Sequence, residues 1–165
     1  MKKASILLLT LAVISLFMFA GCTKEAKTFN KDGISVTLTD EFYEKDYVSA
    51  NIYLESAKNI FIGIKESFSD LNSVGIYSTS TESQYAQVIL NQNVLEEEIL
   101  TNTQNDITLT YIVYQKTVSE KDFTYLAVFK KGAQYFYMLQ FACETKNYSD
   151  TENQFLEWAR TITVE

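Results

Sequence analysis

The chain has 165 residues, with 14 Lys and Arg, 21 Asp and Glu, no His and no Pro. Its net charge of −7 disfavours a nucleic-acid partner, because phosphate recognition needs clustered basic residues. The absence of His excludes Ser-His-Asp triads, Cys-His pairs and histidine metal sites. A single domain is expected at this length, and it is large enough to bury a core without disulfides.

The first 21 residues have the three parts of a secretory signal. Two lysines form a basic start, residues 6–20 are almost entirely apolar, and Ala20 and Gly21 supply a small-residue cleavage site. The apolar stretch is short for a membrane-spanning helix, which needs about 20 residues. We therefore predict that residues 1–21 are a signal peptide that is removed from the mature protein.

The residues around the cleavage site also indicate a lipid modification. Phe19-Ala20-Gly21-Cys22 resembles the lipobox of bacterial lipoproteins, although that family usually has an aliphatic residue in place of Phe19. In that family the cysteine sulfur is diacylated and becomes the new N-terminus. The resemblance implies a lipid on Cys22 and attachment to the cell membrane at its extracytoplasmic face. Apart from this covalent lipid, no cofactor is predicted. The alternative is an ordinary signal peptide followed by an unrelated cysteine.

A short connection separates this cysteine from the first apolar residue. We predict a lipid-anchored linker at residues 22–27 and a single domain at residues 28–165. Lys24, Lys27 and Lys31 lie in the stretch nearest the membrane, where they favour anionic headgroups, although two nearby acidic residues oppose this effect. A fully extended linker reaches roughly 25 Å, so the domain stays close to the bilayer.

Alternation of apolar and polar residues predicts an antiparallel sheet of about six strands. Short polar connections, such as Asn30–Gly33 and Lys130–Ala133, favour hairpins over crossovers. The last three runs are apolar on both faces, which is typical of central strands that are covered on both sides. The predicted runs comprise a short strand ending at Phe29 and residues 34–39, 47–54, 60–65, 107–118, 123–129 and 135–143.

Two segments have helical character. Thr81 to Gln84 fits a capping box, and Ser149 to Glu152 fits a second one. Each is followed by an apolar stripe with helical spacing, and the second stripe includes Trp158, which we place in the core. Glu96 to Glu98 fits either a helix end or a short strand.

The order of these elements resembles the PsbP/Mog1-like fold, in which an antiparallel sheet lies between helices. This resemblance implies an α+β domain with an α/β/α sandwich. PsbP proteins are extrinsic subunits of photosystem II and Mog1 binds a small GTPase, but no residue of either role corresponds to a numbered position here. The segments that carry the resemblance are residues 29–38, 83–86, 131–137 and 155–162.

Neither a catalytic motif nor a metal-binding motif is found. The sequence contains no nucleophile elbow, P-loop or dinucleotide-binding glycine pattern, and the protein is predicted not to be an enzyme. Three acidic groups, at residues 40–46, 96–98 and 150–152, lack the ligand spacing of a calcium loop, so no metal site is predicted. If Cys22 carries lipid, Cys143 has no disulfide partner, and its strand parity predicts a buried thiol.

The tyrosines are the remaining feature, with 11 in the chain. A tyrosine combines a large apolar face with a polar tip, which suits interfaces. The first hypothesis is a non-catalytic binding or accessory module with a protein or glycan partner. The alternative is a small-ligand-binding or carboxylate-dependent hydrolytic lipoprotein. The candidate binding residues, in loops or on polar strand faces, are Tyr43, Tyr47, Tyr53, Tyr77 and Tyr148.

Overall fold

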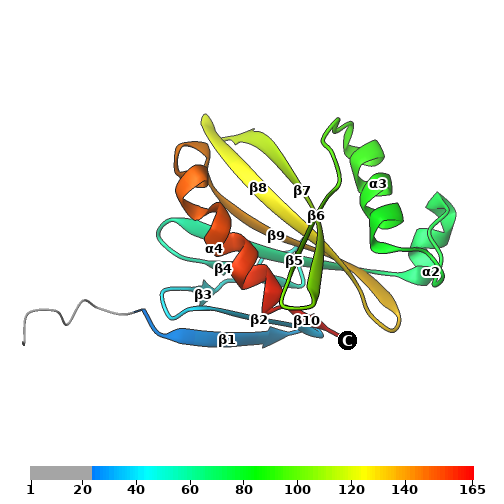
Figure 1. Cartoon of the computed structure of the whole chain (residues 1–165), viewed down its shortest axis with the longest axis horizontal. Helices are drawn as coiled ribbons and strands as arrows, with labels where there is room; N and C mark the ends of the chain where they lie inside the picture. Colours follow the sequence, from blue (N-terminus) through cyan, green and yellow to red (C-terminus); the bar gives the residue numbers. More distant parts are fainter. Residues whose placement is uncertain (1–23) are drawn as a thin grey trace, which may run out of the picture.

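Two antiparallel sheets make up the β-structure in the computed structural model, which describes residues 24–165 (Figure 1). The larger sheet has the order β3-β4-β5-β9-β8-β7-β6, and the smaller has the order β1-β2-β10. The predicted signal peptide and Cys22 lie outside the described residues. The strands are β1 (Ala26–Lys31), β2 (Ile34–Thr39), β3 (Tyr43–Glu44), β4 (Ile52–Glu55), β5 (Asn59–Ser67), β6 (Leu100–Gln104), β7 (Ile107–Val118), β8 (Lys121–Lys131), β9 (Tyr135–Glu144) and β10 (Thr163–Val164).

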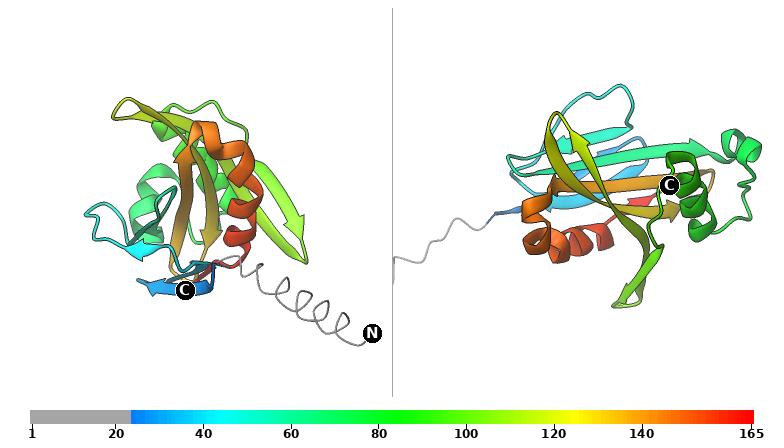
Figure 2. Two further views of the ribbon diagram at one scale, coloured as in Figure 1. Left: turned by 90° about the vertical axis from the view of Figure 1, so that its left-hand side faces the viewer. Right: turned by 90° about the horizontal axis from the view of Figure 1, so that it is seen from above.

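Helices cover both faces of the larger sheet (Figure 2). α4 (Tyr148–Arg160) and the smaller sheet pack on one face, whereas α2 (Phe68–Leu71) and α3 (Glu82–Asn93) pack on the opposite face. Two short 3₁₀ turns, η1 (Asn72–Val74) and η2 (Thr145–Asn147), lead out of α2 and into α4. The α+β sandwich predicted from the sequence is confirmed, but the described residues form ten strands in two sheets instead of about six in one.

The first core lies between the larger sheet, α4 and the smaller sheet. Odd-numbered residues of β9 point into it, and Phe141 packs against Phe61, Phe155 and Trp158 with ring centroids 4.9, 5.4 and 6.1 Å away. Trp158 also makes an edge-to-face contact with Phe42 at 5.4 Å. The predicted core position of Trp158 is therefore confirmed, and this aromatic cluster holds α4 against the sheet.

The second core lies under α3 on the opposite face. Even-numbered residues of β9 point there, and Tyr85 of α3 stacks on Phe136 and meets the edge of Phe129. The predicted capping box is confirmed, because the Thr81 side chain accepts from the Gln84 amide while the Gln84 side chain accepts from the Thr81 amide. The cap fixes where α3 begins and so positions Tyr85 over the sheet.

The hairpin predicted around Asn30–Gly33 is confirmed. Asp32 and Gly33 have φ values of +51° and +80°, and they join β1 to β2 as a two-residue turn. Both central residues of a type I′ turn need positive φ, which Asp tolerates and Gly adopts freely. β1 begins at Ala26, inside the predicted linker at residues 22–27.

Three sequence predictions differ from the structure. The strand predicted at residues 47–54 is shortened to β4, and Val48 is fully exposed in the loop before it. The capping box predicted at Ser149 is wrong, because the N-cap of α4 is Asn147, two residues earlier, and its side chain makes no cap hydrogen bond. β6 was not predicted, because its residues alternate weakly and only its Leu100 is hydrophobic.

Candidate binding surface

Part of the second face of the larger sheet is covered by none of the helices within residues 24–165. α2 and α3 gather at one end of this face (Figure 1). Strand pairing places Tyr43, Tyr53 and Tyr125 on the same face, but on the part beyond these helices. Tyr47 joins them from the loop between β3 and β4. We call Tyr43, Tyr47, Tyr53 and Tyr125 the tyrosine surface.

The Tyr47 and Tyr53 rings stack on one another, with centroids 5.2 Å apart and planes 27° apart. Tyr47 is 57% exposed, whereas Tyr53 is half-buried. The Tyr47 ring therefore covers its neighbour and presents its own outer side to solvent. Tyr125 lies nearby, and its pKa is raised first by burial and then by the proximity of Tyr47.

Glu55 organises one margin of the tyrosine surface. Its Oε1 atom accepts a 2.5 Å hydrogen bond from the Tyr43 hydroxyl and also pairs with the Lys45 ammonium. Both contacts favour the carboxylate, so the pKa of Glu55 is lowered, with Lys45 as the larger cause. Lys45 also lies over the Tyr43 ring, 5.3 Å from its centroid. This margin is held in one arrangement by three interlocking side chains.

A groove lies farther along the same face, between the end of α3 and strands β7 and β9. Tyr114 forms part of its floor, stacks on Tyr125 at 4.9 Å, and donates a 2.5 Å hydrogen bond to Gln140 Oε1. Burial is the main cause that raises the pKa of Tyr114. The groove has a volume of about 420 Å³ and is lined by Ile89, Asn93, Leu95, Ile112, Tyr114, Gln115, Lys116, Met138 and Gln140.

The five tyrosines predicted from the sequence as binding residues do not all lie on one surface. Tyr43, Tyr47 and Tyr53 come together, whereas Tyr77 is exposed in the loop before α3. Tyr148 begins α4, is half-buried against Phe155, and donates to Glu152. The sequence analysis missed Tyr125. Its strand is apolar on both faces, so alternation does not show on which face of the sheet the Tyr125 side chain lies.

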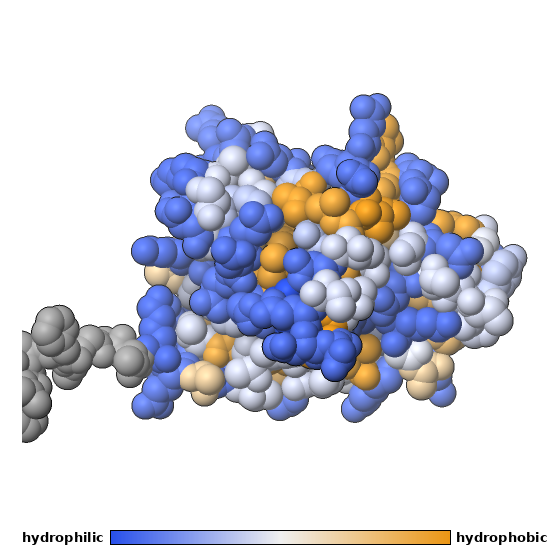
Figure 3. All heavy atoms as spheres, viewed as in Figure 1, coloured by the Kyte–Doolittle hydropathy of each residue, from blue (hydrophilic) through white to orange (hydrophobic). Residues whose placement is uncertain are grey.

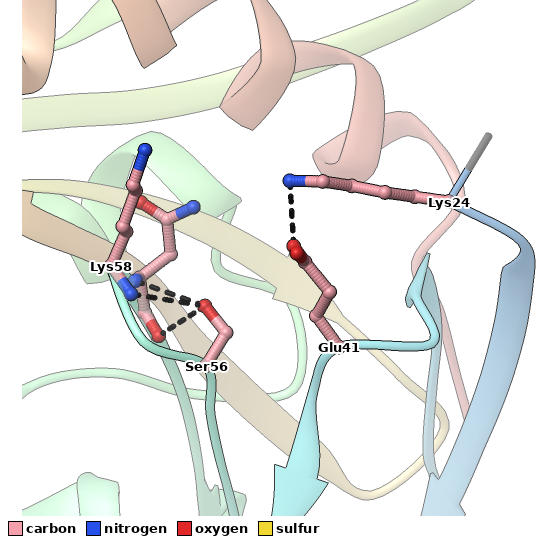
Figure 4. A network of polar contacts seen from close by, with 5 residues as sticks. Lys24, Glu41, Ser56 and Lys58 are labelled. Atoms are coloured by element: carbon pink, nitrogen blue, oxygen red, sulfur yellow. Dashed lines mark hydrogen bonds and ion pairs between the residues drawn. The ribbon is translucent and has the colours of Figure 1, made fainter. Parts of the chain in front are cut away.

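The beginning of the described chain is tied to the body by an ion pair (Figure 4). Lys24 Nζ lies 2.7 Å from Glu41 Oε2, in the loop between β2 and β3, and Figure 4 shows the β4–β5 turn at Ser56 and Lys58 close by. Both partners are about half exposed, so the pair orders the chain more than it stabilises the fold. Lys31 pairs with Glu44, whereas Lys27 lies over the ring of Phe29.

Cys143 is a buried free thiol, as its strand parity predicts. Burial raises its pKa, and a contact with the Thr151 hydroxyl at 3.3 Å opposes this in part. Within residues 24–165, no three His, Cys, Asp or Glu side chains come together as a metal site. None of the helices in this range has the length and hydropathy to cross a bilayer.

Comparisons with known proteins identify the fold. No protein-family model matches the sequence, and no curated protein matches it either. The solution structure of cyanobacterial PsbP (CyanoP) from Synechocystis sp. PCC 6803 aligns with a TM-score of 0.56 and 11% identity, over 89% of this chain and 96% of that one. The fold is PsbP-like.

Two further structures align with this PsbP-like domain. A crystal structure from Bacteroides thetaiotaomicron VPI-5482 has a TM-score of 0.55 and 11% identity, over 84% of this chain and 48% of that one. LpqN, involved in cell envelope biogenesis of Mycobacterium tuberculosis, has a TM-score of 0.46 and 8% identity, over 86% of this chain and 91% of that one. At 11% identity, the likenesses to CyanoP and to the Bacteroides structure show the fold alone, since one fold hosts many functions.

Proposed function

We propose that this protein is a lipid-anchored, extracytoplasmic accessory module that binds a protein or glycan partner through the tyrosine surface. The observation that carries the proposal is the exposed Tyr47–Tyr53 stack, on a part of the sheet that none of the described helices covers. Stacked aromatic rings offer apolar area with little side-chain freedom to lose, and their hydroxyls supply polar contacts.

The proposed anchor rests on Cys22 and on the residues just after it. Two acyl chains on one residue give stable membrane attachment, whereas a single chain does not. Lys24, two residues later, is already paired with Glu41 of the body. Because β1 begins at Ala26, four residues after the acylated position, the body would lie against the bilayer with little freedom to move away.

The alternative of carboxylate-dependent hydrolysis has less support. Such chemistry needs two carboxyl groups that converge on one cleft. The groove beside α3 is lined by apolar, amide, phenol and lysine side chains, with no carboxylate among them. We therefore propose no catalytic step. The groove is within the size range of small-molecule sites, so a bound small ligand is the second candidate function.

The anchor is tested by Cys22→Ser in a lipidating host, with Cys143→Ser as the matched control. We expect Cys22→Ser to move the protein from the membrane to the soluble fraction, while the control stays membrane-bound. Mass spectrometry of the mature N-terminus should show a diacylglyceryl group on Cys22. An unmodified Cys22 in membrane-bound protein would contradict the anchor.

The binding surface is tested by Tyr47→Ala combined with Tyr53→Ala, with Tyr77→Ala as the control. Tyr77 is also an exposed tyrosine, but it lies outside the tyrosine surface. We expect chemical cross-linking in native membranes to capture a partner with the wild type and the control, and to lose it with the double variant. Equal capture by all three proteins would remove the tyrosine surface from the proposal.

A further inference from the structure

Strand β7 is longer than its outer neighbour. β6 pairs with its first five residues, from Ile107 to Tyr111, whereas β8 pairs with it as far as Val118. Beyond Tyr111, nothing in residues 24–165 makes a backbone hydrogen bond to the outer edge of β7. About seven residues of strand edge, roughly 20 Å, are therefore open.

The geometry of the β7–β8 hairpin decides which residues present their backbone at this edge. The hairpin closes through the two-residue turn Ser119–Glu120, so the flanking pair Val118 and Lys121 exchanges backbone hydrogen bonds. Along two antiparallel strands, residue pairs that exchange backbone hydrogen bonds alternate with pairs whose backbone groups point away from one another. The N–H and C=O groups of Val113, Gln115 and Thr117 consequently point away from β8, toward the open edge.

The groove described above runs beside this edge. Side chains of Ile112, Tyr114 and Lys116 line it from β7, and Ile89 and Leu95 line it from the side of α3. Figure 3 shows apolar residues gathered on the surface over the connection between α3 and β6. A strand placed on the open edge would therefore direct alternate side chains into a groove with a mixed apolar and polar lining, as in strand addition to a sheet.

Three glutamates in the connection from α3 to β6 outnumber the one lysine of the groove, Lys116, so the charges near the edge favour a basic occupant. The connection from α3 to β6 carries Glu96, Glu97 and Glu98 in succession, and one Glu97 oxygen is buried without a hydrogen-bond partner within residues 24–165. Glu97 is close enough to Tyr114 in the groove to act on it electrostatically. Three neighbouring carboxylates attract Lys and Arg side chains, and charge assistance strengthens a hydrogen bond to any of them.

A second copy of the chain fits this edge less well. Residues 22–165 carry a net charge of −9 once Lys2 and Lys3 are removed, so two copies of the chain repel one another. Like charges brought together across an interface oppose association. The edge accordingly favours a partner of opposite charge.

We propose that the open edge of β7, from Val113 to Thr117, binds an extended basic polypeptide segment as an added strand, with alternate side chains in the groove beside α3. This site adjoins the tyrosine surface, because Tyr114 of the groove stacks on Tyr125, but it uses the backbone edge of β7 and does not depend on the lipid anchor. Backbone hydrogen bonds to the edge would supply much of the affinity, and the groove and the glutamates would select the side chains.

The experiment uses random heptapeptides displayed on phage as the probe and the purified protein as bait. Selection should enrich peptides that alternate apolar residues with Lys or Arg. A synthetic copy of an enriched peptide should slow hydrogen exchange at the amides of Val113, Gln115 and Thr117. No enrichment, or protection elsewhere only, would overturn the proposal.

A pair of substitutions at one position separates backbone pairing from side-chain contact. Gln115→Pro removes an outward N–H without removing a β7–β8 hydrogen bond, which an edge strand tolerates. It should weaken peptide binding about tenfold, whereas Gln115→Ala, which keeps the outward N–H and loses only the side chain, should weaken it by a clearly smaller factor. Circular dichroism checks that the Gln115→Pro variant is folded. If this variant does not fold, the hydrogen-exchange experiment on the wild type still tests the proposal.

Two further outcomes decide the identity of the occupant. Glu97→Gln should weaken binding of basic peptides by a few-fold, since one negative charge is lost beside the groove. A dimer that forms at micromolar concentration and is lost in Gln115→Pro would show that a second copy occupies the edge. That result would overturn the proposed polypeptide partner.

Discussion

The Tyr85 hydroxyl donates a 2.5 Å hydrogen bond to Glu66 Oε2, which joins the first turn of α3 to strand β5. The Tyr85 ring is fully buried, so its hydroxyl has no water to replace this partner. Tyr85→Phe should therefore lower the free energy of unfolding by about 1–2 kcal/mol. Urea denaturation followed by circular dichroism measures the change. A loss below about 0.3 kcal/mol would mean that Glu66 finds another donor.

The buried tyrosines also predict how stability changes at alkaline pH. Burial is the main cause that raises the pKa of Tyr85, Tyr114 and Tyr148 above the usual value of 10.0. The stability linked to these neutral hydroxyls is thus fully present below pH 10 and is lost as the pH rises above it. Thermal unfolding between pH 7 and 11 should show a falling Tm above pH 10. The fall should be shallower in Tyr85→Phe, and equal slopes would argue against this linkage.

Much of the fold is predictable from strand periodicity. Residues 107–118 were predicted as one strand and form β7 with the same bounds, and the odd-numbered residues of β9 share one core as their parity requires. Alternation works here because a side-chain period of two sets which face is buried. It failed at residues 47–54, where Val48 continues the apolar pattern in an exposed loop.

Other elements depend on tertiary contacts that local sequence does not encode. β10 has only two residues, and it is a strand because it pairs with β2. β6 is an edge strand whose residues are mostly polar and alternate weakly. A usable signal for β6 was the Asn105–Asp106 pair, whose positive φ values turn the chain into β7. The tyrosine surface was predicted in part, because loop positions mark exposure but do not reveal which loops meet.

Trp158 should make a large contribution to stability. Its ring contacts Phe42, Phe141 and Phe155, and it lies at the junction of α4 with the sheet. Trp158→Ala removes these contacts and leaves a cavity, so we expect a loss of about 3–5 kcal/mol. Trp158→Phe keeps one ring in place and should cost less than half as much. Guanidinium denaturation of both variants measures the change in the free energy of unfolding. A loss under about 1 kcal/mol for Trp158→Ala would contradict the core position.

The two capping-box sequences should respond differently to the same type of substitution. Thr81→Ala removes a side-chain acceptor for the Gln84 amide and should cost about 1 kcal/mol. Ser149→Ala should be nearly neutral, because Ser149 lies inside the first turn of α4 and caps nothing. Differential scanning calorimetry of the two variants compares them directly. Equal losses would mean that Ser149 caps α4 in solution.

Cys143 should be unreactive until the protein unfolds. The thiol is buried under α4 and burial raises its pKa, so both access and the thiolate fraction are low at neutral pH. In Cys22→Ser protein, where Cys143 is the remaining cysteine, the rate of labelling by a thiol reagent at pH 8 should be at least about tenfold lower in buffer than in denaturant. The residual native rate should rise with added urea in step with unfolding, because modification requires α4 to leave the sheet. Rapid labelling in buffer alone, at the rate of a free cysteine, would mean that α4 opens readily and that the aromatic cluster around Phe141 does not hold it.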